Sequence, residues 1–288
     1  MSIAISAPAK LNLGLEVVGR RPDGLHELVS IMVNIDIADR LVLAAGSGLE
    51  VTGPYAGGAP SDPAREIASR ALAALAVEAG RPIDMRLAID KRIPAGAGLG
   101  GGSGDAAAVL RAAPALGVEV APDRLVQVAM NLGADVPFQL TGGAALVRGA
   151  GEQVEALPVP DLWVAVVFPA IALSTAAVFA ELQADEWGDG KVLEATARFL
   201  RDGGGPGALS RLPNSLLAPA TRVCPELAEV IAVLRRRGWD PRLTGTGSAL
   251  FQVCFDRGEA EALAVKTWDI GLRAWAVQAV PAPPAPSH

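Results

Sequence analysis

The sequence is poor in the residues that build disulfide frameworks and metal sites. Its 288 residues include two cysteines, Cys224 and Cys254, and two histidines. A small disulfide-stapled domain needs several cysteines, and a structural zinc site needs several closely spaced cysteine or histidine ligands. The sequence therefore excludes a disulfide scaffold and a histidine-rich metal site.

Long apolar runs and blocks of positive charge are also lacking. The longest apolar run, LWVAVVFPAIAL at 162–173, contains Pro169 and falls short of the roughly 20 residues that a membrane-spanning helix needs. Residues 1–10, MSIAISAPAK, do not show the charged and apolar regions of a signal peptide. The net charge is −6 and the longest basic run is Arg235–Arg237, whereas nucleic-acid binding relies on a basic surface. We therefore expect a cytoplasmic protein whose partners include neither a membrane nor nucleic acid.

What the sequence has instead is the composition of a packed globular protein. Hydrophobic residues make up 51% of the chain and charged residues 19%, and its length suits one large or two ordinary domains. Period-two and helical patterns alternate along the chain, which indicates a mixed α+β fold. Strands are expected over 9–18, 41–44, 85–90, 163–168, 250–255 and 273–280, and helices over 63–80, 103–113, 123–132, 175–182, 191–201, 225–237 and 258–268.

Two prolines, Pro158 and Pro160, mark a change of pattern between the two halves of the chain. We therefore expect an N-terminal domain over 1–158 and a C-terminal domain over 159–280. The remaining residues, 281–288, have the sequence PAPPAPSH, and a proline-rich composition of this kind is typical of a disordered tail.

The strongest local signal is PAGAGLGGGSGDAAA at 94–108, which has six glycines in nine positions before a helical pattern. Glycines let backbone N–H groups approach a ligand closely, and a helix N-terminus attracts anions. The stretch therefore indicates a phosphate site rather than a flexible loop. It also fits the dinucleotide pattern G-x-G-x-x-G, which is weak evidence alone, and it lacks the lysine of a P-loop.

Two further stretches accompany this glycine loop, PAKLNLGL at 8–15 and LTGTGSALF at 243–251. Together, and in this order, the three resemble the motifs of the GHMP kinases. RRPDGLHEL at 20–28 and GADVPFQLTGGAALVRGAGE at 133–152 extend the resemblance over nearly the whole chain. These two stretches are similar to the members of the family that phosphorylate a cytidine-diphosphate alcohol.

The resemblance implies an N-terminal ribosomal-S5-domain-2-like α/β domain and a C-terminal ferredoxin-like α+β domain, with the active site in the cleft between them. It also implies ATP and Mg²⁺ as cofactors, and transfer of the γ-phosphoryl group to the 2-hydroxyl of a methylerythritol moiety in isoprenoid biosynthesis. A monomer or a homodimer is expected. The alternatives are a homoserine- or mevalonate-type kinase, an inactive nucleotide-binding regulator and, third, a nicotinamide-binding dehydrogenase.

The motifs assign catalytic roles to Asp135 and Lys10. By resemblance, Asp135 accepts the proton of the substrate hydroxyl; the local sequence alone suits a turn residue after Gly133 equally well. Lys10, otherwise a surface charge beside a strand, projects with Asn12 from the face opposite the leucines. There its cation would stabilise the Asp135 carboxylate and offset charge on the transferring phosphoryl group, and Asn12 would orient the hydroxyl.

The resemblance places the phosphates of ATP on the glycine loop. The residues concerned are Pro94, Ala95, Gly96, Ala97, Gly98, Leu99, Gly100, Gly101, Gly102, Ser103 and Gly104. Ser103 is the expected N-cap of the following helix, and Ser103 or Asp105 is the candidate for holding Mg²⁺. Asp105 would repel a triphosphate unless its side chain points away or a cation intervenes. Gly104 stands where the family commonly has a second serine, so one hydroxyl contact is missing there.

On the substrate side, the resemblance gives cytosine recognition to His26 and Phe179. His26 would hydrogen-bond the base and Phe179 would stack on it, although a phenylalanine here suits a hydrophobic core equally well. Leu25 stands where the family typically has a tyrosine, so part of a stacking energy of about 1–3 kcal/mol per base is lost. Asn214, in LPNSLL, is assigned no role. The turn TGTGS supplies further substrate contacts, at Thr244, Gly245, Gly247 and Ser248.

Overall fold

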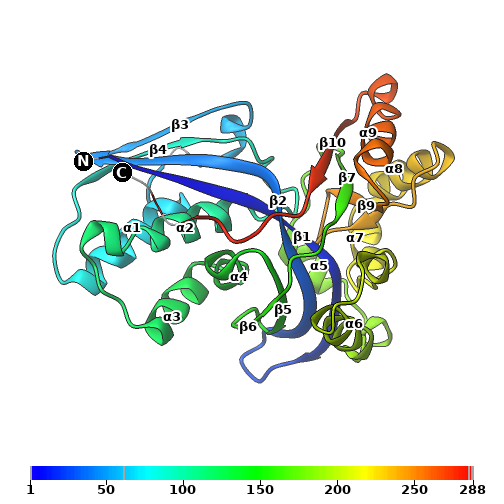
Figure 1. The fold of residues 1–288 in the computed structure, drawn as a ribbon, viewed down its shortest axis with the longest axis horizontal. Coiled ribbons are helices and arrows are strands. Elements are labelled where there is room, and N and C mark those ends of the chain that lie inside the picture. The colour runs from blue at the N-terminus through cyan, green and yellow to red at the C-terminus, as the bar shows by residue number, and fades with distance from the viewer. Residues whose placement is uncertain (1, 61, 285, 287–288) are drawn as a thin grey trace.

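The structure is a computed structural model that describes residues 2–60, 62–284 and 286, and it contains two β-sheets (Figure 1). The first sheet has the order β3–β4–β2–β5–β6, with β1 paired to β2, and the second has the order β10–β7–β9–β8. The strands of the first sheet are β1 (Ser2–Arg20), β2 (His26–Ala45), β3 (Leu49–Thr52), β4 (Met85–Asp90), β5 (Ala144–Gly149) and β6 (Gln153–Leu157). The strands of the second sheet are β7 (Trp163–Phe168), β8 (Arg242–Leu243), β9 (Leu250–Cys254) and β10 (Arg273–Gln278).

Four helices bury one face of the first sheet. They are α1 (Ile67–Ala79), α2 (Gly101–Arg111), α3 (Pro122–Leu132) and α4 (Val136–Thr141). Their alanines, leucines and valines pack against the strand residues Ile3, Leu43 and Leu87. The ends of α1 have a chemical cause, because the Glu66 carboxylate accepts the N–H of Ser69 and Gly80 closes the helix in the left-handed conformation.

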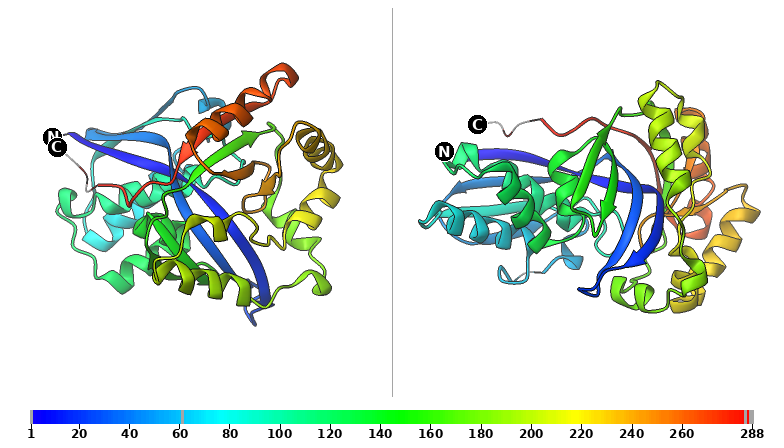
Figure 2. Two further views of the ribbon diagram at one scale, coloured as in Figure 1. Left: turned by 45° about the vertical axis from the view of Figure 1, so that its right-hand side comes forward. Right: turned by 90° about the horizontal axis from the view of Figure 1, so that it is seen from below.

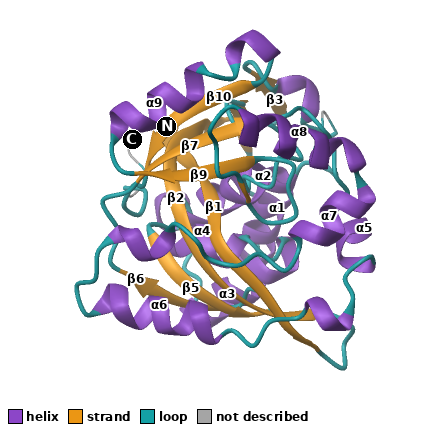
Figure 3. Cartoon of the chain, turned by 90° about the vertical axis from the view of Figure 1, so that its right-hand side faces the viewer, coloured by secondary structure: helices purple, strands orange, loops and turns teal. Residues whose placement is uncertain are grey.

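The remaining helices belong to the second half of the chain (Figure 3). They are α5 (Thr175–Ala180), α6 (Lys191–Arg201), α7 (Leu217–Val223), α8 (Pro225–Arg236) and α9 (Arg257–Val265). Helices α5, α7, α8 and α9 pack on one face of the second sheet, for example through Leu227 and Leu263 against Val167. Helix α6 instead packs through Leu193 and Leu200 on the first sheet, although the chain enters it from the second.

The largest core cluster lies between the two sheets. It joins Leu11, Leu13 and Ile31 of the first sheet to Val166 and Phe251 of the second. Every one of these side chains is at most 3% exposed. Strand β1 is therefore buried on both faces over most of its length, and a polar side chain on it has to find its partners inside the protein.

Strands β1 and β2 form one long curved hairpin. The hairpin belongs to the first sheet and extends beside the second (Figure 2). Their register shifts at three places, between Pro8 and Ala9, between Asn12 and Gly14, and between Val17 and Gly19. A bulge bends a strand and redirects its side chains. Two of these shifts flank Lys10 and Asn12, so the hairpin is bent at the segment that carries both.

The mixed α+β fold with two sheets, predicted from the sequence, is confirmed. The helix over 191–201 and the strands over 85–90 and 163–168 are also confirmed. The segment after residue 45, for which neither strand nor helix was expected, contains the short strand β3, and the strand expected at 41–44 is only the end of β2. No helix among the described residues is long and apolar enough to cross a membrane.

The boundary between residues 158 and 159 stays a prediction. Of the tail predicted to be disordered over 281–288, residues 285, 287 and 288 lie outside the described residues. Ala282 and Pro283 are described and lie against Gly142, where an added Cβ would come within 2.6 Å of the proline ring.

Gly14 provides a test of how tightly β1 is packed. An added Cβ at Gly14 would lie 2.5 Å from Leu193 Cδ2 and 2.7 Å from Leu212 Cβ. Overpacking of a core typically costs about 1–3 kcal/mol. We expect Gly14→Ala to lower the free energy of unfolding in urea by about that amount. Gly57→Ala is the control, since no described atom lies within 4 Å of an added Cβ there. Equal urea midpoints for the two variants would contradict this account.

Candidate active site

Two adjoining cavities meet at the glycine loop. The first, of about 290 Å³, lies between the first sheet and the second half of the chain and is lined from β1, β2, the residues just before α4, α5 and the turn at 245–246. The second, of about 350 Å³, is lined by the glycine loop, the start of α1 and Lys91. Gly98 and Ser103 line both cavities. A group bound in one cavity is therefore adjacent to a group bound in the other.

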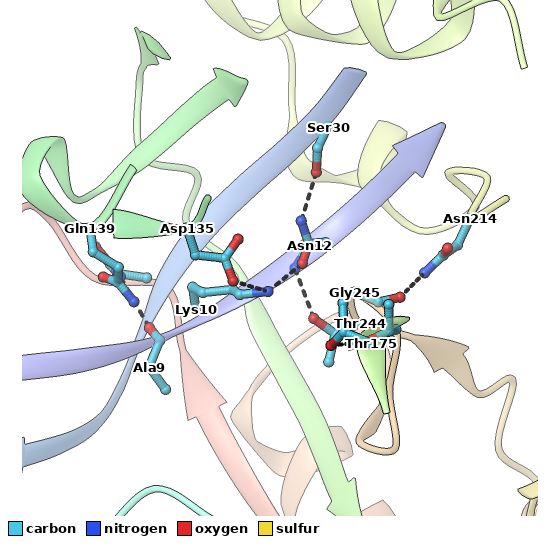
Figure 4. Close-up of polar contacts among 12 residues, drawn as sticks. Ala9, Lys10, Asn12, Ser30, Asp135, Gln139, Thr175, Asn214, Thr244 and Gly245 are labelled. Atoms are coloured by element: carbon cyan, nitrogen blue, oxygen red, sulfur yellow. Dashed lines mark hydrogen bonds and ion pairs between the residues drawn. The ribbon is translucent and has the colours of Figure 1, made fainter. Parts of the chain in front are cut away.

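The polar centre of the first cavity is an ion pair between β1 and α4 (Figure 4). Lys10 Nζ lies 3.3 Å from Asp135 Oδ2 and donates a 2.6 Å hydrogen bond to Asn12 Oδ1. The lysine is 2% exposed, whereas the aspartate side chain is 38% exposed. The carboxylate is therefore accessible from the cavity, and a buried cation faces it from behind.

Asp135 is also the residue that precedes the first turn of α4. A helix N-terminus carries a partial positive charge, which favours a carboxylate at this position. The carboxylate thus lies between two sources of positive potential, the helix end and the Lys10 ammonium. Asp135 can therefore accept a proton, and the Lys10 ammonium beside it can stabilise negative charge that develops on a bound group.

Asn12 is held in one orientation by its neighbours. Its Nδ2 donates to Ser30 Oγ at 2.8 Å, and the Ser30 hydroxyl donates in turn to the carbonyl of Gly14 at 2.8 Å. The backbone N–H of Asn12 donates to Thr244 Oγ1 at 2.9 Å, which connects β1 to the turn of the second half. The sequence did not reveal Ser30, because nothing in its local pattern distinguishes it from an ordinary strand serine.

The glycine loop folds tightly because several of its glycines adopt positive φ. The φ angles of Gly96, Gly98 and Gly100 are 69°, 75° and 68°. An added Cβ at Gly98 would lie 2.6 Å from the carbonyl oxygen of Thr244, so this glycine lets the loop pack against the turn of the other half. At this position a side chain would be excluded by both conformation and space.

Helix α2 begins two residues earlier than the sequence suggested. The expected N-cap was Ser103, but the N-cap is Gly100, whose left-handed conformation a serine side chain would disfavour. Ser103 lies in the first turn and lines both cavities instead. The first N–H groups of a helix have no intrahelical partner, so α2 offers donors and a positive dipole end to an anion in the second cavity.

A buried charge cluster of Lys91, Asp39 and Asp105 lies next to the glycine loop. The sequence indicated Asp105 but neither Lys91 nor Asp39. Lys91 Nζ pairs with Asp39 and, at 2.6 Å, with Asp105 Oδ2. Asp39 Oδ1 also accepts the backbone N–H of Ile93 at 2.8 Å and that of Arg92. Lys91 therefore offsets the charge of Asp105 beside the second cavity, which both residues line, and Asp39 anchors the chain where the glycine loop begins.

Burial raises the pKa of Asp105 well above its usual range, against the opposing effect of Lys91. Burial alone would lower the pKa of Lys91, but the two carboxylates outweigh it and raise that pKa. The lysine is therefore held as a cation. The adjacent DKRIP at 90–94 signals a lysine before the glycine loop, but burial of Asp39 cannot be read from its strand pattern.

The residues near the glycine loop do not form a metal site by themselves. No group of three His, Cys, Asp or Glu side chains with metal-binding geometry occurs among the residues that the structure describes. Of the two predicted Mg²⁺ candidates, Asp105 has one oxygen on Lys91, and its Oδ1 is buried without a partner among the described residues. Ser103 lines both cavities. Such a donor set suits an ion held mainly by nucleotide phosphates.

Of the two residues predicted to read the base, Phe179 lines the first cavity and His26 stacks on Phe179. The rings of His26 and Phe179 are stacked, with centroids 4.8 Å apart and planes inclined by 26°. Phe179 lines the cavity, and the Leu25 side chain is 51% exposed. Burial lowers the pKa of His26, and the charge of Arg20 acts in the same direction.

The turn TGTGS is brought next to Lys10 and Asn12, but its members differ in position. Gly245 and Thr246 line the first cavity, and Thr244 is fully buried against Asn12. Ser248 donates to the carbonyl of Ile171 instead. Asn214 donates from Nδ2 to the carbonyls of Leu243 and Gly245, so it supports the turn.

Comparison with known proteins first defines the class. A family model described as the GHMP kinases N terminal domain matches residues 66–143. The crystal structure of homoserine kinase from Cytophaga hutchinsonii superposes with a TM-score of 0.74 over 99% of this chain and 96% of that one, at 20% identity. The fold is therefore that of the GHMP kinases.

More similar proteins narrow the class. The 4-diphosphocytidyl-2-C-methyl-D-erythritol kinase of Thermus thermophilus is 40% identical over 94% of each chain, and that of Polaromonas naphthalenivorans is 36% identical over 90% of this chain and 88% of its own. A crystal structure of 4-(cytidine 5'-diphospho)-2C-methyl-D-erythritol kinase superposes with a TM-score of 0.78 at 38% identity, over 96% of this chain and 99% of that one. The chain belongs to the 4-diphosphocytidyl-2-C-methyl-D-erythritol kinase family.

Removal of Lys91 tests the charge cluster. Lys91→Met leaves Asp39 and Asp105 buried without their cation, and loss of one partner of a buried ion pair typically costs about 3–5 kcal/mol. We expect the free energy of unfolding in urea to fall by about this amount. Lys191→Met is the matched control, because Lys191 pairs with Asp189 on the surface, and its urea midpoint should hardly change. Similar midpoints for both variants would refute the assignment.

Proposed function

We propose that this chain transfers the γ-phosphoryl group of ATP to the 2-hydroxyl of 4-diphosphocytidyl-2-C-methyl-D-erythritol, a step of the non-mevalonate isoprenoid pathway. The observation that carries the proposal is the Lys10–Asp135 pair in the first cavity, which shares Gly98 and Ser103 with a second cavity lined by a glycine loop and a helix N-terminus. The family to which the chain belongs supports the same reaction.

The Asp135 carboxylate is the proton acceptor in this proposal. As the substrate hydroxyl oxygen forms its bond to the γ-phosphorus, the hydroxyl proton passes to Asp135 and the bond from the γ-phosphorus to the bridging oxygen breaks, which releases ADP. Lys10, 3.3 Å from Asp135, offsets the negative charge on the transferring group. Asn12 orients the hydroxyl, since its amide is fixed by Ser30 and Lys10.

The glycine loop holds the triphosphate. The start of α2 lines the second cavity, where its free N–H groups would bind the phosphates, and Lys91 offsets the charge of Asp105 there. Mg²⁺, when bound by the phosphates, would neutralise their charge, and the Ser103 hydroxyl is the side chain placed to help hold it.

The cytosine base is recognised by His26 and Phe179. The lowered pKa of His26 keeps the imidazole neutral at neutral pH, so that it offers one donor and one acceptor to the edge of a base. Because the two rings stack on each other, a base that stacks on Phe179 has to separate them. Leu25, mostly exposed beside His26, offers no aromatic face for the other side of the base.

A panel of acceptors tests the reaction. ADP release coupled to a reporter should require 4-diphosphocytidyl-2-C-methyl-D-erythritol and should be absent with homoserine, with mevalonate and with the alcohol lacking its cytidylyl group. Turnover with homoserine or mevalonate would support another GHMP kinase activity. Nucleotide binding without turnover of any acceptor would support an inactive regulator.

Asp135→Asn tests the proton acceptor. The amide keeps the shape of the side chain but cannot take the hydroxyl proton. A general base typically contributes 10²–10⁴-fold, so we expect kcat to fall at least about 10²-fold while ATP affinity, measured by calorimetry, changes little. Turnover close to that of the native protein would remove Asp135 from the mechanism.

Leu25→Tyr tests base stacking. An aromatic ring beside His26 should supply part of a stacking energy of about 1–3 kcal/mol and lower the KM for the cytidylyl substrate. The KM for ATP should stay the same. Val77→Tyr is the control, since Val77 is an exposed valine of α1. An unchanged or higher substrate KM in Leu25→Tyr would argue against stacking at this position.

A further inference from the structure

Helix α4 carries Asp135 but is too short to hold its own position. It has six residues, and the Asp135 side chain makes no capping hydrogen bond to it. Helices of this length have little stability of their own and depend on tertiary contacts. The position of Asp135 relative to Lys10 is therefore set by whatever fixes α4 against β1.

Gln139 lies one helical turn after Asp135 and is fully buried. Its backbone N–H donates to the carbonyl of Asp135 at 3.1 Å. Its side-chain Nε2 donates to the carbonyl of Pro8 at 3.1 Å, and its Oε1 accepts from Asn34 Nδ2 at 2.9 Å. The Gln139 side chain on α4 therefore points into the first sheet and hydrogen-bonds the backbone of β1.

Asn34, on β2, links Gln139 to β1 and to Gly143. Its Nδ2 also donates to the carbonyl of Ala9 at 3.1 Å, and its Oδ1 accepts the N–H of Gly143 at 2.9 Å. Asn34 is likewise fully buried. The two amides therefore bind the carbonyls of Pro8 and Ala9, the two residues immediately before Lys10.

These carbonyls are available because the β1–β2 register shifts between Pro8 and Ala9. A register shift leaves backbone groups without their ladder partners, and buried carbonyls need a donor. The two side-chain amides supply the donors. The bulge beside Lys10 and the amide pair are therefore parts of one arrangement.

Gln139, one member of this amide pair, also lies against the start of α2. An added Cβ at Gly100 would lie 2.8 Å from Lys10 Cγ and 3.4 Å from Gln139 Nε2, and at Gly104 it would lie 3.5 Å from the same nitrogen. The start of α2 therefore rests on Lys10 and Gln139. Gln139 contacts the helix of the aspartate, the strand of the lysine and the helix of the glycine loop.

Other contacts hold α4 in the fold without fixing its register against β1. Phe138 is buried against Met32, Ala145 and Val147, and Arg111 Nη1 donates to the Gln139 carbonyl at 2.6 Å. Apolar packing tolerates small sliding motions, whereas hydrogen bonds between buried amides and carbonyls prescribe one register. Loss of the amide pair should therefore shift α4 rather than unfold it.

We propose that Asn34 and Gln139 are positioning residues for the phosphoryl transfer, which set the distance between Asp135 and Lys10, and that Gln139 also supports the start of α2 beside Lys10. The inference rests on the proposed function. A misplacement of reacting groups by about 1 Å can cost up to about 10²-fold in rate. The amide pair should therefore act on kcat rather than on substrate binding.

The test is the kinetic effect of Gln139→Met, which keeps the length of the side chain and removes its hydrogen bonds. We expect kcat to fall about 10-fold to 10²-fold while the KM values for ATP and the cytidylyl substrate change little. The matched control is Thr267→Val, a fully buried residue whose hydroxyl bonds Ala264 and Leu272 in the second half of the chain. It should lower the melting temperature and leave kcat unchanged. A native kcat in Gln139→Met, with a melting temperature lowered as in the control, overturns the proposal.

A second variant covers the case in which Gln139→Met fails to fold. Asn34→Ser removes the bonds to Ala9 and Gln139 and should lower kcat in the same way. Because the two residues form one unit, the double variant should lose no more kcat than the worse single variant. Multiplied losses would show that the residues act separately and overturn the pairing.

A crystal structure distinguishes failure of this inference from failure of the proposed function. In Gln139→Met, the distance from Lys10 Nζ to Asp135 Oδ2 should exceed the 3.3 Å of the native chain. That readout does not require turnover, so it holds even if the native protein does not phosphorylate the cytidylyl alcohol. An unchanged distance contradicts the positioning role alone.

Discussion

The structure depends on the burial of one ammonium group in the middle of a strand. Taking a charge out of water costs several kcal/mol unless it is paired and hydrogen-bonded. Lys10 is 2% exposed, so its partners have to come to it, and they do so from separate parts of the chain, Asn12 from the same strand and Asp135 from α4. Desolvation of the lysine and assembly of the site are therefore the same event in folding.

The second constraint is close approach of backbone to backbone around this lysine. The glycine loop crosses Lys10 and packs on the turn of the second half so tightly that a methyl group at Gly98 or Gly100 would collide. The glycine loop thus also closes the contact between the halves. Glycine is required at these two positions by packing, since any larger residue would place a Cβ atom against Thr244 or Lys10.

Much of this arrangement could be predicted from the sequence, for reasons that are local. The spacing of apolar residues and the residues at its ends predicted the helix over 191–201. The glycine loop could be recognised from its composition. The elements that were missed depend on distant partners. Asp39 has the pattern of an ordinary strand residue and becomes a buried anchor only because Lys91 reaches it from the end of another strand. Gln139 stands among apolar residues, and its role arises from a bulge in β1 that no local pattern reveals. Helix α2 begins earlier than predicted because its N-cap is Gly100 rather than Ser103. Gly100 adopts a left-handed conformation, which a serine side chain would disfavour.

The course of the chain end has a mechanical consequence. After β10 the backbone returns to the first sheet, where the N–H of Val280 donates to the carbonyl of Asn34 and Ala282 lies against Gly142. The chain thus passes between the sheets twice, once between β6 and β7 and once here, and the curved hairpin of β1 and β2 spans the same interface. The two chain crossings and the shared core connect the halves at separate places. These connections restrain the halves from moving apart as rigid bodies.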